Sequence, residues 1–366
     1  MKKKILVLLS HLDDFGGTHR VAIGLANRMA EDYDVHIVAI HGKDEQSLYA
    51  IDERISHAAL LARGGRLRVL IIKARKPLVR YIIEHDIDVV LVIGNHQAFV
   101  GLSSVVTCQR SKYVFCDHGA LANQWDDRAT RVIHRLNATF YDAIVVLTQQ
   151  SRQDYIERLN VSPRKIRVIA NWIDSRLIRN PTVFDSRAQT LLWAGRLDQE
   201  KGVDHLLAIA TQVLPPRPSW QWHVFGEGKL KDWLVQRIEE HGLNGQLKIL
   251  GYTPDLYAEY AQSGVVTLTS YREGLPLVLL EAAACGIPLI SFDVTTGPRE
   301  IIHDGVNGFL ITPYDREQYA KALGELMDNE QLRTNMSSRA RDDIERFSQE
   351  AVYAQWRTLI QELVSD

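Results

Sequence analysis

Long apolar runs, a dominant charge and paired cysteines are all missing from this sequence of 366 residues. No stretch reaches the ~18 apolar residues of a membrane-spanning helix, so we predict a soluble protein or one that sits on a membrane without crossing it. Lys and Arg number 43 against 45 Asp and Glu, and this balance argues against nucleic acid as a partner. The three cysteines lack metal-type spacing, which predicts small buried thiols in a reducing cytoplasm.

Dinucleotide and metal motifs are also scarce. No G-x-G-x-x-G follows the first predicted strand, which argues against a plain dinucleotide site. Two D-x-D matches, Asp32/Asp34 and Asp86/Asp88, would suit a metal-dependent transferase, but both come directly before predicted strands. They therefore belong to the amino end of a sheet, away from the edge where ligands bind, and we expect no metal site.

The sequence does contain short Val/Ile/Leu-rich runs that alternate with amphipathic helical segments in two successive halves. Apolar strands separated by helices are typical of a parallel sheet covered on both faces, and this chain length favours two cores. We therefore predict an α/β fold with two Rossmann-like domains that face each other across a cleft. The predicted strands are KILVLLS, DVHIVAI, RLRVLII, DVVLVIG, KYVFCDH, DAIVVLT, TLLWAGR, WQWHVFGEG, LKILGY, GVVTLTS, IPLISFD and GFLITP.

A polar stretch at 171–189 separates the two halves and is predicted to be a linker. We place an N-terminal domain at 1–172 and a C-terminal domain at 173–345. The last segment, 346–366, is helical by its period, and we expect it to pack back on the N-terminal domain. Ligands of such domains bind at the carboxyl ends of the strands, so functional residues are sought in the turns that follow strands.

The stretch EGLPLVLLEAAACGIPLI at 273–290 has two carboxylates in apolar surroundings. We expect a helix from Pro276 whose free N-terminal amides bind an anion. Glu281 has apolar neighbours at helical spacing, so it does not lie on a solvated side of the helix. We expect it to point along the helix flank into the cleft, where it faces water and can bind a ligand hydroxyl. The alternative is structural: Glu273 caps the helix and Glu281 has a partner on another helix.

Two cations follow another predicted strand in AGRLDQEKG. Arg196 ends the strand and Lys201 begins the next helix. Beside an anion-binding helix they would neutralise a diphosphate, whereas a solvated basic turn is the alternative.

These residues resemble those of the retaining glycosyltransferases of family 4 (group 1), which have the GT-B fold. HVFGEG at 223–228 and DGVNGFL at 304–310 fit the same family, and the domain order matches over nearly the whole chain. The motifs that carry the resemblance are E-x7-E, at Glu273 and Glu281, and G-R-x-x-x-x-K-G, at Gly195, Arg196, Lys201 and Gly202.

The resemblance implies a role for each matched residue of the C-terminal domain. Arg196 and Lys201 would hold the donor diphosphate without a metal or other cofactor. Glu281 would bind the ribose and Glu273 the transferred hexose. The remaining donor-binding residues are Gly274, Leu275, Pro276 and Leu277 at the helix start, and Tyr252 and Thr253 near the base.

The N-terminal domain would hold the acceptor. The resemblance implies that the loop at Gly16 and Gly17 lies under the donor, where glycines permit close backbone approach. It also implies that His118 lies close to the transferred sugar as a catalytic residue, with Asp117 orienting it. The alternative is a hydrogen-bonded histidine at a strand end.

A basic segment in the N-terminal half is a separate signal. From Arg63 to Arg80 the chain has seven Lys or Arg and no acid, interleaved with apolar residues. This composition suits an anionic membrane surface and would place a lipid-linked acceptor at the inner leaflet. The alternative is an ordinary strand followed by a basic surface helix.

The resemblance implies a hexosyltransferase that moves a hexose or N-acetylhexosamine with retention of configuration. SFDVTTGPREII at 291–302 is similar to stretches in enzymes that use UDP-sugars. The acceptor would be a glycan or lipid-linked sugar of surface polysaccharide, lipopolysaccharide or lipid-linked oligosaccharide synthesis. A nucleotide-sugar 2-epimerase and a non-catalytic nucleotide-sugar-binding subunit are alternatives on the same fold.

Overall fold

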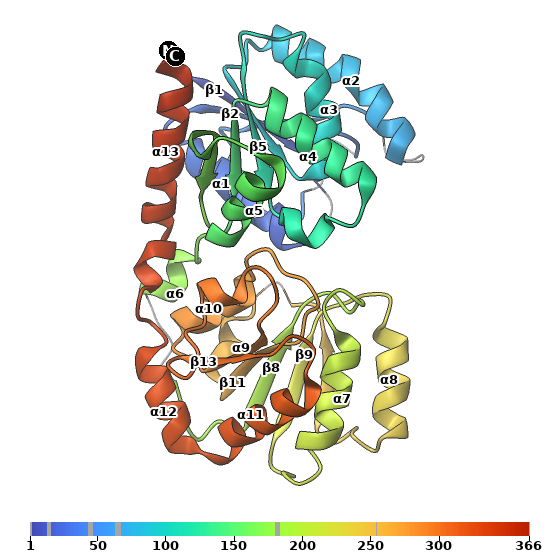
Figure 1. Cartoon of the computed structure of the whole chain (residues 1–366), viewed down its shortest axis with the longest axis vertical. Helices are drawn as coiled ribbons and strands as arrows, with labels where there is room; N and C mark the ends of the chain where they lie inside the picture. The colour runs from blue at the N-terminus through green and yellow to red at the C-terminus, as the bar shows by residue number, and fades with distance from the viewer. Residues whose placement is uncertain are drawn as a thin grey trace. The chain divides into compact units, whose positions relative to one another are not determined.

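The computed structural model of the chain consists of two compact units (Figure 1). The N-terminal unit is Met1–Asn171 with Glu350–Asp366, and the C-terminal unit is Trp172–Gln349. Residues 346–349, which we predicted with the last helix, therefore belong to the C-terminal unit. The structure describes residues 2–12, 16–42, 47–62, 67–179, 184–253 and 255–365.

The N-terminal unit is built on a parallel sheet in the order β3-β2-β1-β4-β5-β6-β7. The central strands are buried throughout because helices cover both faces. The strands are β1 (Lys4–Leu9), β2 (Asp34–Ala39), β3 (Ser56–Ala59), β4 (Val89–Ile93), β5 (Lys112–Asp117), β6 (Ala143–Val146) and β7 (Ile166–Val168).

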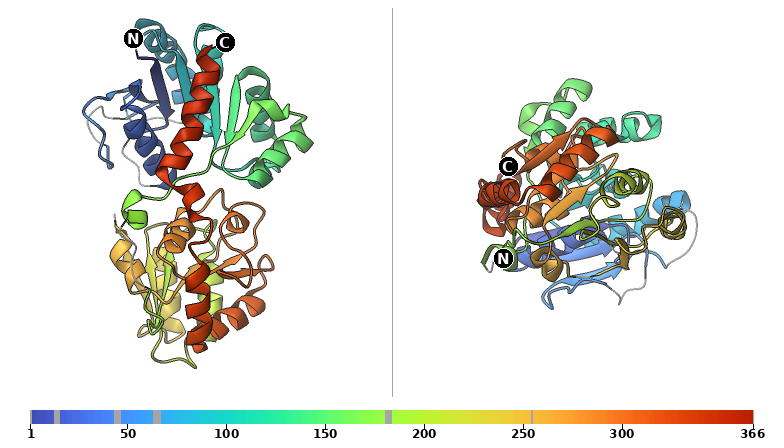
Figure 2. Two further views of the ribbon diagram at one scale, coloured as in Figure 1. Left: turned by 90° about the vertical axis from the view of Figure 1, so that its left-hand side faces the viewer. Right: turned by 90° about the horizontal axis from the view of Figure 1, so that it is seen from below.

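The two faces of this sheet are covered by different helices. α2 (Leu67–Glu84), α3 (Asn95–Val105) and α4 (Arg128–Phe140) lie side by side on one face, and α5 (Gln149–Leu159) adds Tyr155 to their core (Figure 1). α1 (Gly17–Met29) and α13 (Gln349–Ser365) lie together on the other, as Figure 2 shows. Tyr353 of α13 donates a hydrogen bond to Asp32 at 2.7 Å, and the Arg28 guanidinium lies over its ring.

Three elements of this unit differ from the prediction. The run RLRVLII is not a strand, because its described part, from 67, belongs to α2. Ala74, Leu78 and Ile82 recur every fourth residue and are buried, so helical packing overrides the β-branched composition. The strands β3 and β7 were missed because they are short edge strands without a continuous apolar run.

The C-terminal unit repeats the plan with a parallel sheet in the order β10-β9-β8-β11-β12-β13. Its strands are β8 (Thr190–Ala194), β9 (Gln221–Phe225), β10 (Leu247–Gly251), β11 (Val265–Leu268), β12 (Leu289–Phe292) and β13 (Gly308–Ile311). Its helices are α6 (Ser175–Arg179), α7 (Val203–Val213), α8 (Lys231–Glu240), α9 (Tyr257–Ala261), α10 (Leu277–Ala284), α11 (Arg316–Asp328) and α12 (Glu330–Arg339).

Each sheet reverses its strand order at one point, between β1 and β4 and between β8 and β11. Loops diverge at such a point and leave a crevice at the carboxyl edge, where ligands of these folds bind. Asp88 lies at the opposite, amino edge, where its carboxylate accepts from the backbone N–H of Lys4 at 2.8 Å. The three cysteines are buried and free.

Candidate functional site

The strongest cluster of predicted site residues lies at the β8/β11 reversal of the C-terminal unit. β8 and β11 are hydrogen-bonded neighbours, so the loop after β8 and the turn after β11 leave the same edge of the sheet. The first carries Arg196 and Lys201, and the second carries Glu273. The strand order therefore brings together residues that are more than seventy positions apart in the sequence.

Lys201 and Glu273 form an ion pair, with 2.7 Å between Nζ and Oε1. Ser270 donates its hydroxyl to the same Glu273 oxygen at 2.6 Å, and the Lys201 backbone N–H donates to Asp198 at 3.1 Å. Glu273 is buried, whereas the Lys201 side chain keeps 21% of its surface exposed. The pair thus presents a held cation to solvent beside a buried carboxylate.

Gly202 allows the loop to approach β11 this closely. Its φ is +67°, and a Cβ built there would lie 1.9 Å from the Thr269 carbonyl oxygen. Thr269 in turn donates its hydroxyl to the carbonyl of Gly202 at 3.1 Å. Only glycine satisfies both the backbone angle and the space, so the residue after Lys201 determines where Lys201 lies.

Arg196 is arranged differently from Lys201. Its side chain is 61% exposed, and its Nη2 lies 3.4 Å from Asp198 Oδ2 and 3.5 Å from Glu200 Oε2. Loose, exposed pairs of this kind contribute little stability and exchange readily. The guanidinium is therefore available to an anion that enters the same loop.

Glu281 corrects an expectation. It is only 2% exposed, not facing water, and its Oε2 accepts a hydrogen bond from the Tyr260 hydroxyl at 2.9 Å. Tyr260 comes from α9, and this helix-to-helix partner is the alternative that the sequence left open. The carboxylate is thus hydrogen-bonded without any ligand, which offsets part of the cost of burying it.

The start of α10 contains the predicted anion-binding amides. Pro276 is the N-cap residue rather than the first helical residue, and no side chain caps this end. Gly274, Leu275, Pro276 and Leu277 directly follow Glu273, whose carbonyl accepts from the Thr296 hydroxyl. The N-terminus of α10 and Glu273, the carboxylate of the Lys201–Glu273 pair, therefore belong to the same turn after β11.

The turn after β10 lies close to the same edge through two backbone links. Gly226 donates its N–H to the Gly251 carbonyl at 2.8 Å, and Gly195 donates to the Phe225 carbonyl at 3.0 Å. These links join the turn of Tyr252 and Thr253 to the loop of Arg196. Tyr252 is 44% exposed, so its ring could stack on the ring of a ligand.

Sequence reasoning missed the polar residues that hold the site in place. Ser270 and Asp198 each lie three residues before the group they bind, and such local spacing could have suggested them. Tyr260 has no local signal, because it meets Glu281 only through the packing of α9 on α10.

The N-terminal unit places its predicted residues at its own carboxyl edge, but the described polar contacts there include residues that were not predicted, such as Ser10 and His11, whose Oγ and Nδ1 lie 2.7 Å apart. Gly16 precedes α1 with a φ of 166°, in extended backbone, and a Cβ there would meet nothing within 4 Å. His118 follows β5, two strands away from β1. Gly17 is the first residue of α1 and is exposed.

Asp117 does not orient His118 as predicted. Its carboxylate accepts from the Tyr155 hydroxyl at 2.9 Å and from the Gly119 backbone N–H at 3.1 Å, and no hydrogen bond to the His118 side chain is found within the described ranges. Tyr155 also bonds Nδ1 of His134 at 2.6 Å, so Asp117 belongs to a buried internal network. Desolvation lowers the pKa of His118 to about 4, although the Asp117 charge opposes the shift, so the ring is neutral at pH 7.

Two parallel α/β units, with a cation–carboxylate cluster at a strand-order reversal, place this chain among the doubly wound α/β proteins, whose ligands bind at the carboxyl edge of the sheet. Two family models narrow this class. Residues 15–177 match Glycosyltransferase Family 4, and residues 174–343 match Glycosyl transferases group 1, so together the models span most of the chain. The chain therefore belongs to the group 1 glycosyltransferases and is a glycosyltransferase.

Two relatives and a solved structure illustrate what this chain is similar to. An exopolysaccharide phosphotransferase of Streptomyces coelicolor is 30% identical over 99% of this chain, which spans 41% of that relative's length. An N-acetylgalactosaminyltransferase of Campylobacter jejuni, named for a diphospho-undecaprenol-linked acceptor, is 24% identical over 91% of this chain and 92% of its own. The Staphylococcus aureus TarM structure with UDP has a TM-score of 0.83 at 18% identity, covering 98% of this chain and 99% of that one, and shows the GT-B fold.

Proposed function

We propose that this glycosyltransferase moves a hexose or N-acetylhexosamine from a UDP-sugar to a glycan or lipid-linked acceptor, with retention of anomeric configuration. The pathway is surface polysaccharide, lipopolysaccharide or lipid-linked oligosaccharide synthesis at the cytoplasmic face of the plasma membrane. The observation that carries the proposal is the Lys201–Glu273 pair at the β8/β11 reversal. The names of the exopolysaccharide and undecaprenol relatives, and UDP in the TarM complex, support the substrate class.

The charge that develops on the diphosphate during transfer explains the proposed roles. The bond between the anomeric carbon and the diphosphate breaks, the acceptor oxygen bonds to that carbon, and the acceptor proton leaves with UDP. Negative charge grows on the diphosphate, where Lys201, Arg196 and the α10 amides stabilise it, so no metal is needed. Glu273 holds sugar hydroxyls, and Glu281 the ribose.

The remaining residues around the donor and the transferred sugar complete the proposal. Tyr252 and Thr253 hold the base, the loop at Gly16 and Gly17 lies under the donor, and His118 lies near the transferred sugar as a neutral hydrogen-bonding group. In the described parts of the chain no helix is long and apolar enough to cross a bilayer. The enzyme would therefore reach a lipid-linked acceptor from the membrane surface.

The test combines binding with product analysis. UDP should raise the melting temperature more than GDP or ADP, because a ligand stabilises the state that binds it. UDP-sugars incubated with bacterial lipid extract, in the presence of EDTA, should yield UDP and an α-linked product by NMR. A free epimerised sugar without acceptor would favour an epimerase, and intact donor after long incubation would favour a binding subunit; either result would refute the proposal.

A further inference from the structure

The outward side of α2 exposes large apolar side chains. Val69, Ile72 and Ile83 are 44%, 67% and 62% exposed. They lie opposite the side of the helix that packs on the sheet, where Ala74, Leu78 and Ile82 are buried. Three of the exposed cations of α2, Lys73, Lys76 and Arg80, fall among them at helical spacing, and Arg75 is exposed as well. This mixture is unusual for a surface helix, which normally exposes polar side chains of both signs.

The neighbouring helices continue the same surface. α3 packs beside α2 and α4 beside α3, and Figure 1 shows the three on one side of the N-terminal unit. α3 has no charged residue and exposes Phe99, whereas α4 exposes apolar and basic side chains together. The exposed large apolar and basic residues of α4 are Val132, Leu136, Phe140, Arg128 and Arg135, and the small Ala129 and Thr139 are exposed as well.

No acid interrupts this surface. Residues 67–83, 95–105 and 128–140 contain no Asp or Glu, and the nearest acids along the chain lie at the ends of α2 and α4: Glu84, Asp86, Asp126, Asp127 and Asp142. We call the outward sides of α2, α3 and α4 the basic-apolar face. Its charge is all of one sign although the whole chain has a net charge of only −2.

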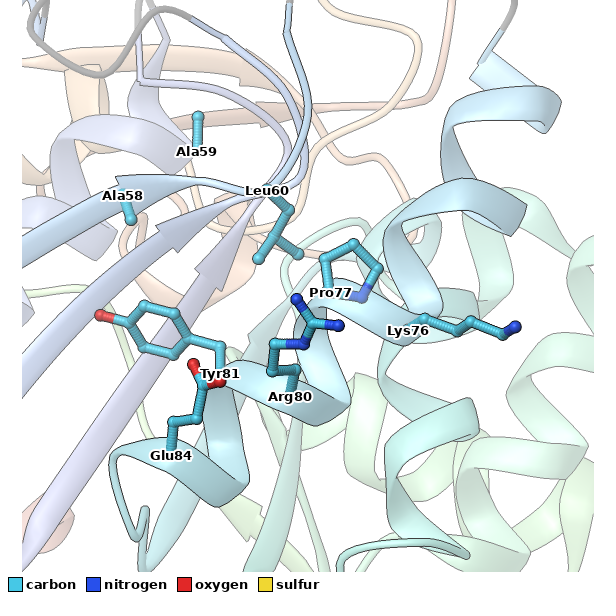
Figure 3. Close-up of a pocket in the computed structure, with 8 residues that line it drawn as sticks. All are labelled: Ala58, Ala59, Leu60, Lys76, Pro77, Arg80, Tyr81 and Glu84. Atoms are coloured by element: carbon cyan, nitrogen blue, oxygen red, sulfur yellow. The ribbon is translucent and has the colours of Figure 1, made fainter.

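A cavity of about 380 Å³ opens along one flank of α2 (Figure 3). Leu60, Pro77 and Tyr81 give it apolar walls, and Lys76 and Arg80, two cations of the basic-apolar face, also line it, together with Glu84. In Figure 3 the Arg80 side chain points toward Pro77 and Leu60, whereas the Lys76 side chain points away from them. The cavity could therefore receive an anionic group attached to an apolar one.

We propose that the basic-apolar face docks the enzyme on an anionic lipid bilayer. Exposed cations attract anionic headgroups, and apolar side chains between them enter the interface, so the two kinds of side chain bind the same surface. A nucleic acid would use the cations alone and leave the apolar residues exposed. The purpose of the docking, delivery of a lipid-linked acceptor, rests on the proposed function, but the docking itself needs neither donor nor acceptor.

The test is flotation of the full chain with vesicles of phosphatidylcholine alone and of phosphatidylcholine mixed equally with phosphatidylglycerol. The wild type should bind the mixed vesicles far better. Each cation near an anionic surface strengthens binding about five-fold, so the triple variant Lys73→Gln/Lys76→Gln/Arg80→Gln should lose about 100-fold. The pair Ile72→Ser/Ile83→Ser should weaken the binding that remains at high salt.

A matched control separates this face from the field of the whole protein. Arg237, Lys321 and Arg339 are exposed cations of α8, α11 and α12 in the other unit, and their triple replacement by Gln changes the net charge equally. The control should bind vesicles like the wild type. Equal losses in both triple variants, or wild-type binding that is the same with neutral vesicles, would overturn the proposal.

Two further readouts complete the test. Sedimentation velocity tests whether the face is instead an interface between two copies of the chain. A dimer that is present in the wild type and lost in the Ile72→Ser/Ile83→Ser variant would show such an interface, and we expect none. The UDP-induced rise in melting temperature should be the same in all variants. A variant that keeps this rise but loses vesicle binding supports docking even if no sugar transfer is found, so the two proposals can fail separately.

Discussion

The two units share one architecture but use their carboxyl edges differently. In the C-terminal unit the loops after β8 and β11 bring Lys201, Ser270 and Glu273 into direct contact. In the N-terminal unit the corresponding edge has histidines instead, since Ser10 Oγ lies 2.7 Å from His11 Nδ1 and 3.5 Å from His19 Nε2, whereas Asp117 turns inward to Tyr155. The same sheet plan thus supports a lysine–carboxylate pair in one unit and a serine–histidine cluster in the other, because the loops rather than the sheet carry function.

Removing the central cation of the C-terminal site should have the largest effect. Lys201→Ala should lower kcat by about 10²- to 10³-fold, because a group that stabilises developing charge acts mainly in the transition state. Steady-state UDP release measures this effect. Lys321→Ala, an exposed lysine of α11, is the control, and a Lys201 variant as active as this control would remove the cluster from the reaction.

A pair of glycine substitutions compares the two edges directly. Gly202→Ala places a Cβ 1.9 Å from the Thr269 oxygen at a positive φ, so we expect a loss of about 2 to 4 kcal/mol of unfolding free energy and little transfer. Gly16→Ala meets nothing within 4 Å at an extended φ and should leave stability unchanged.

Urea unfolding of both glycine variants measures the difference, and transfer assays add a second one. If the loop at Gly16 lies under the donor, Gly16→Ala should slow transfer at full stability. Equal stability losses in the two variants would contradict the contrast between the packed Gly202 and the open Gly16.

Glu281 separates a ligand role from a structural one. Glu281→Ala should raise the Kd for UDP about ten-fold, since a charge-assisted hydrogen bond is lost. Tyr260→Phe removes only the hydroxyl that bonds Glu281 at 2.9 Å and should lower stability by about 1 kcal/mol with UDP affinity kept. Calorimetric titration checks both. A Glu281→Ala variant that loses stability but binds UDP normally would make the residue purely structural.

Acid should lower the unfolding free energy of both units, by less than the Gly202 substitution does. Desolvation lowers the pKa of His118 and of His205 to about 4, so each folded state resists protonation that the unfolded chain accepts below about pH 6.5. Stability is therefore full above pH 6.5 and falls toward pH 4. Each histidine should contribute on the order of 1 kcal/mol to the loss between pH 7 and pH 5.

Variants of these histidines extend the comparison of the units. His118→Gln and His205→Gln should each reduce the loss between pH 7 and pH 5 in urea titrations. At pH 7 only His205→Gln should lose stability, because His205 accepts from Arg316 at 2.7 Å and packs on Tyr271. The exposed His57 gives a control, and a His57→Gln variant with the same pH response as His118→Gln would exclude this origin.

The sequence predicted what depends on local pattern and missed what depends on packing. Continuous apolar runs such as those of β1, β4 and β11 identified the central strands and hence the α/β class. The helix α2 was missed over its first turns because a β-branched run resembles a strand until the partners of Ala74 and Leu78 are known. The prediction that Glu281 faces water was wrong for the same reason, since α9 brings Tyr260 to Glu281 only in the folded unit.

The Lys201–Glu273 pair makes Glu273 a tethered competitor for any anion that approaches Lys201. Because the chain holds the Glu273 carboxylate 2.7 Å from Nζ of Lys201, bulk salt weakens this competition only slightly. An incoming anion that merely displaces Glu273 leaves a buried carboxylate without its cation, and inorganic phosphate is such a ligand. A molecule with a phosphate for Lys201 and hydroxyl donors for Glu273 satisfies both halves of the broken pair, so the site should select bifunctional ligands over anions of equal charge.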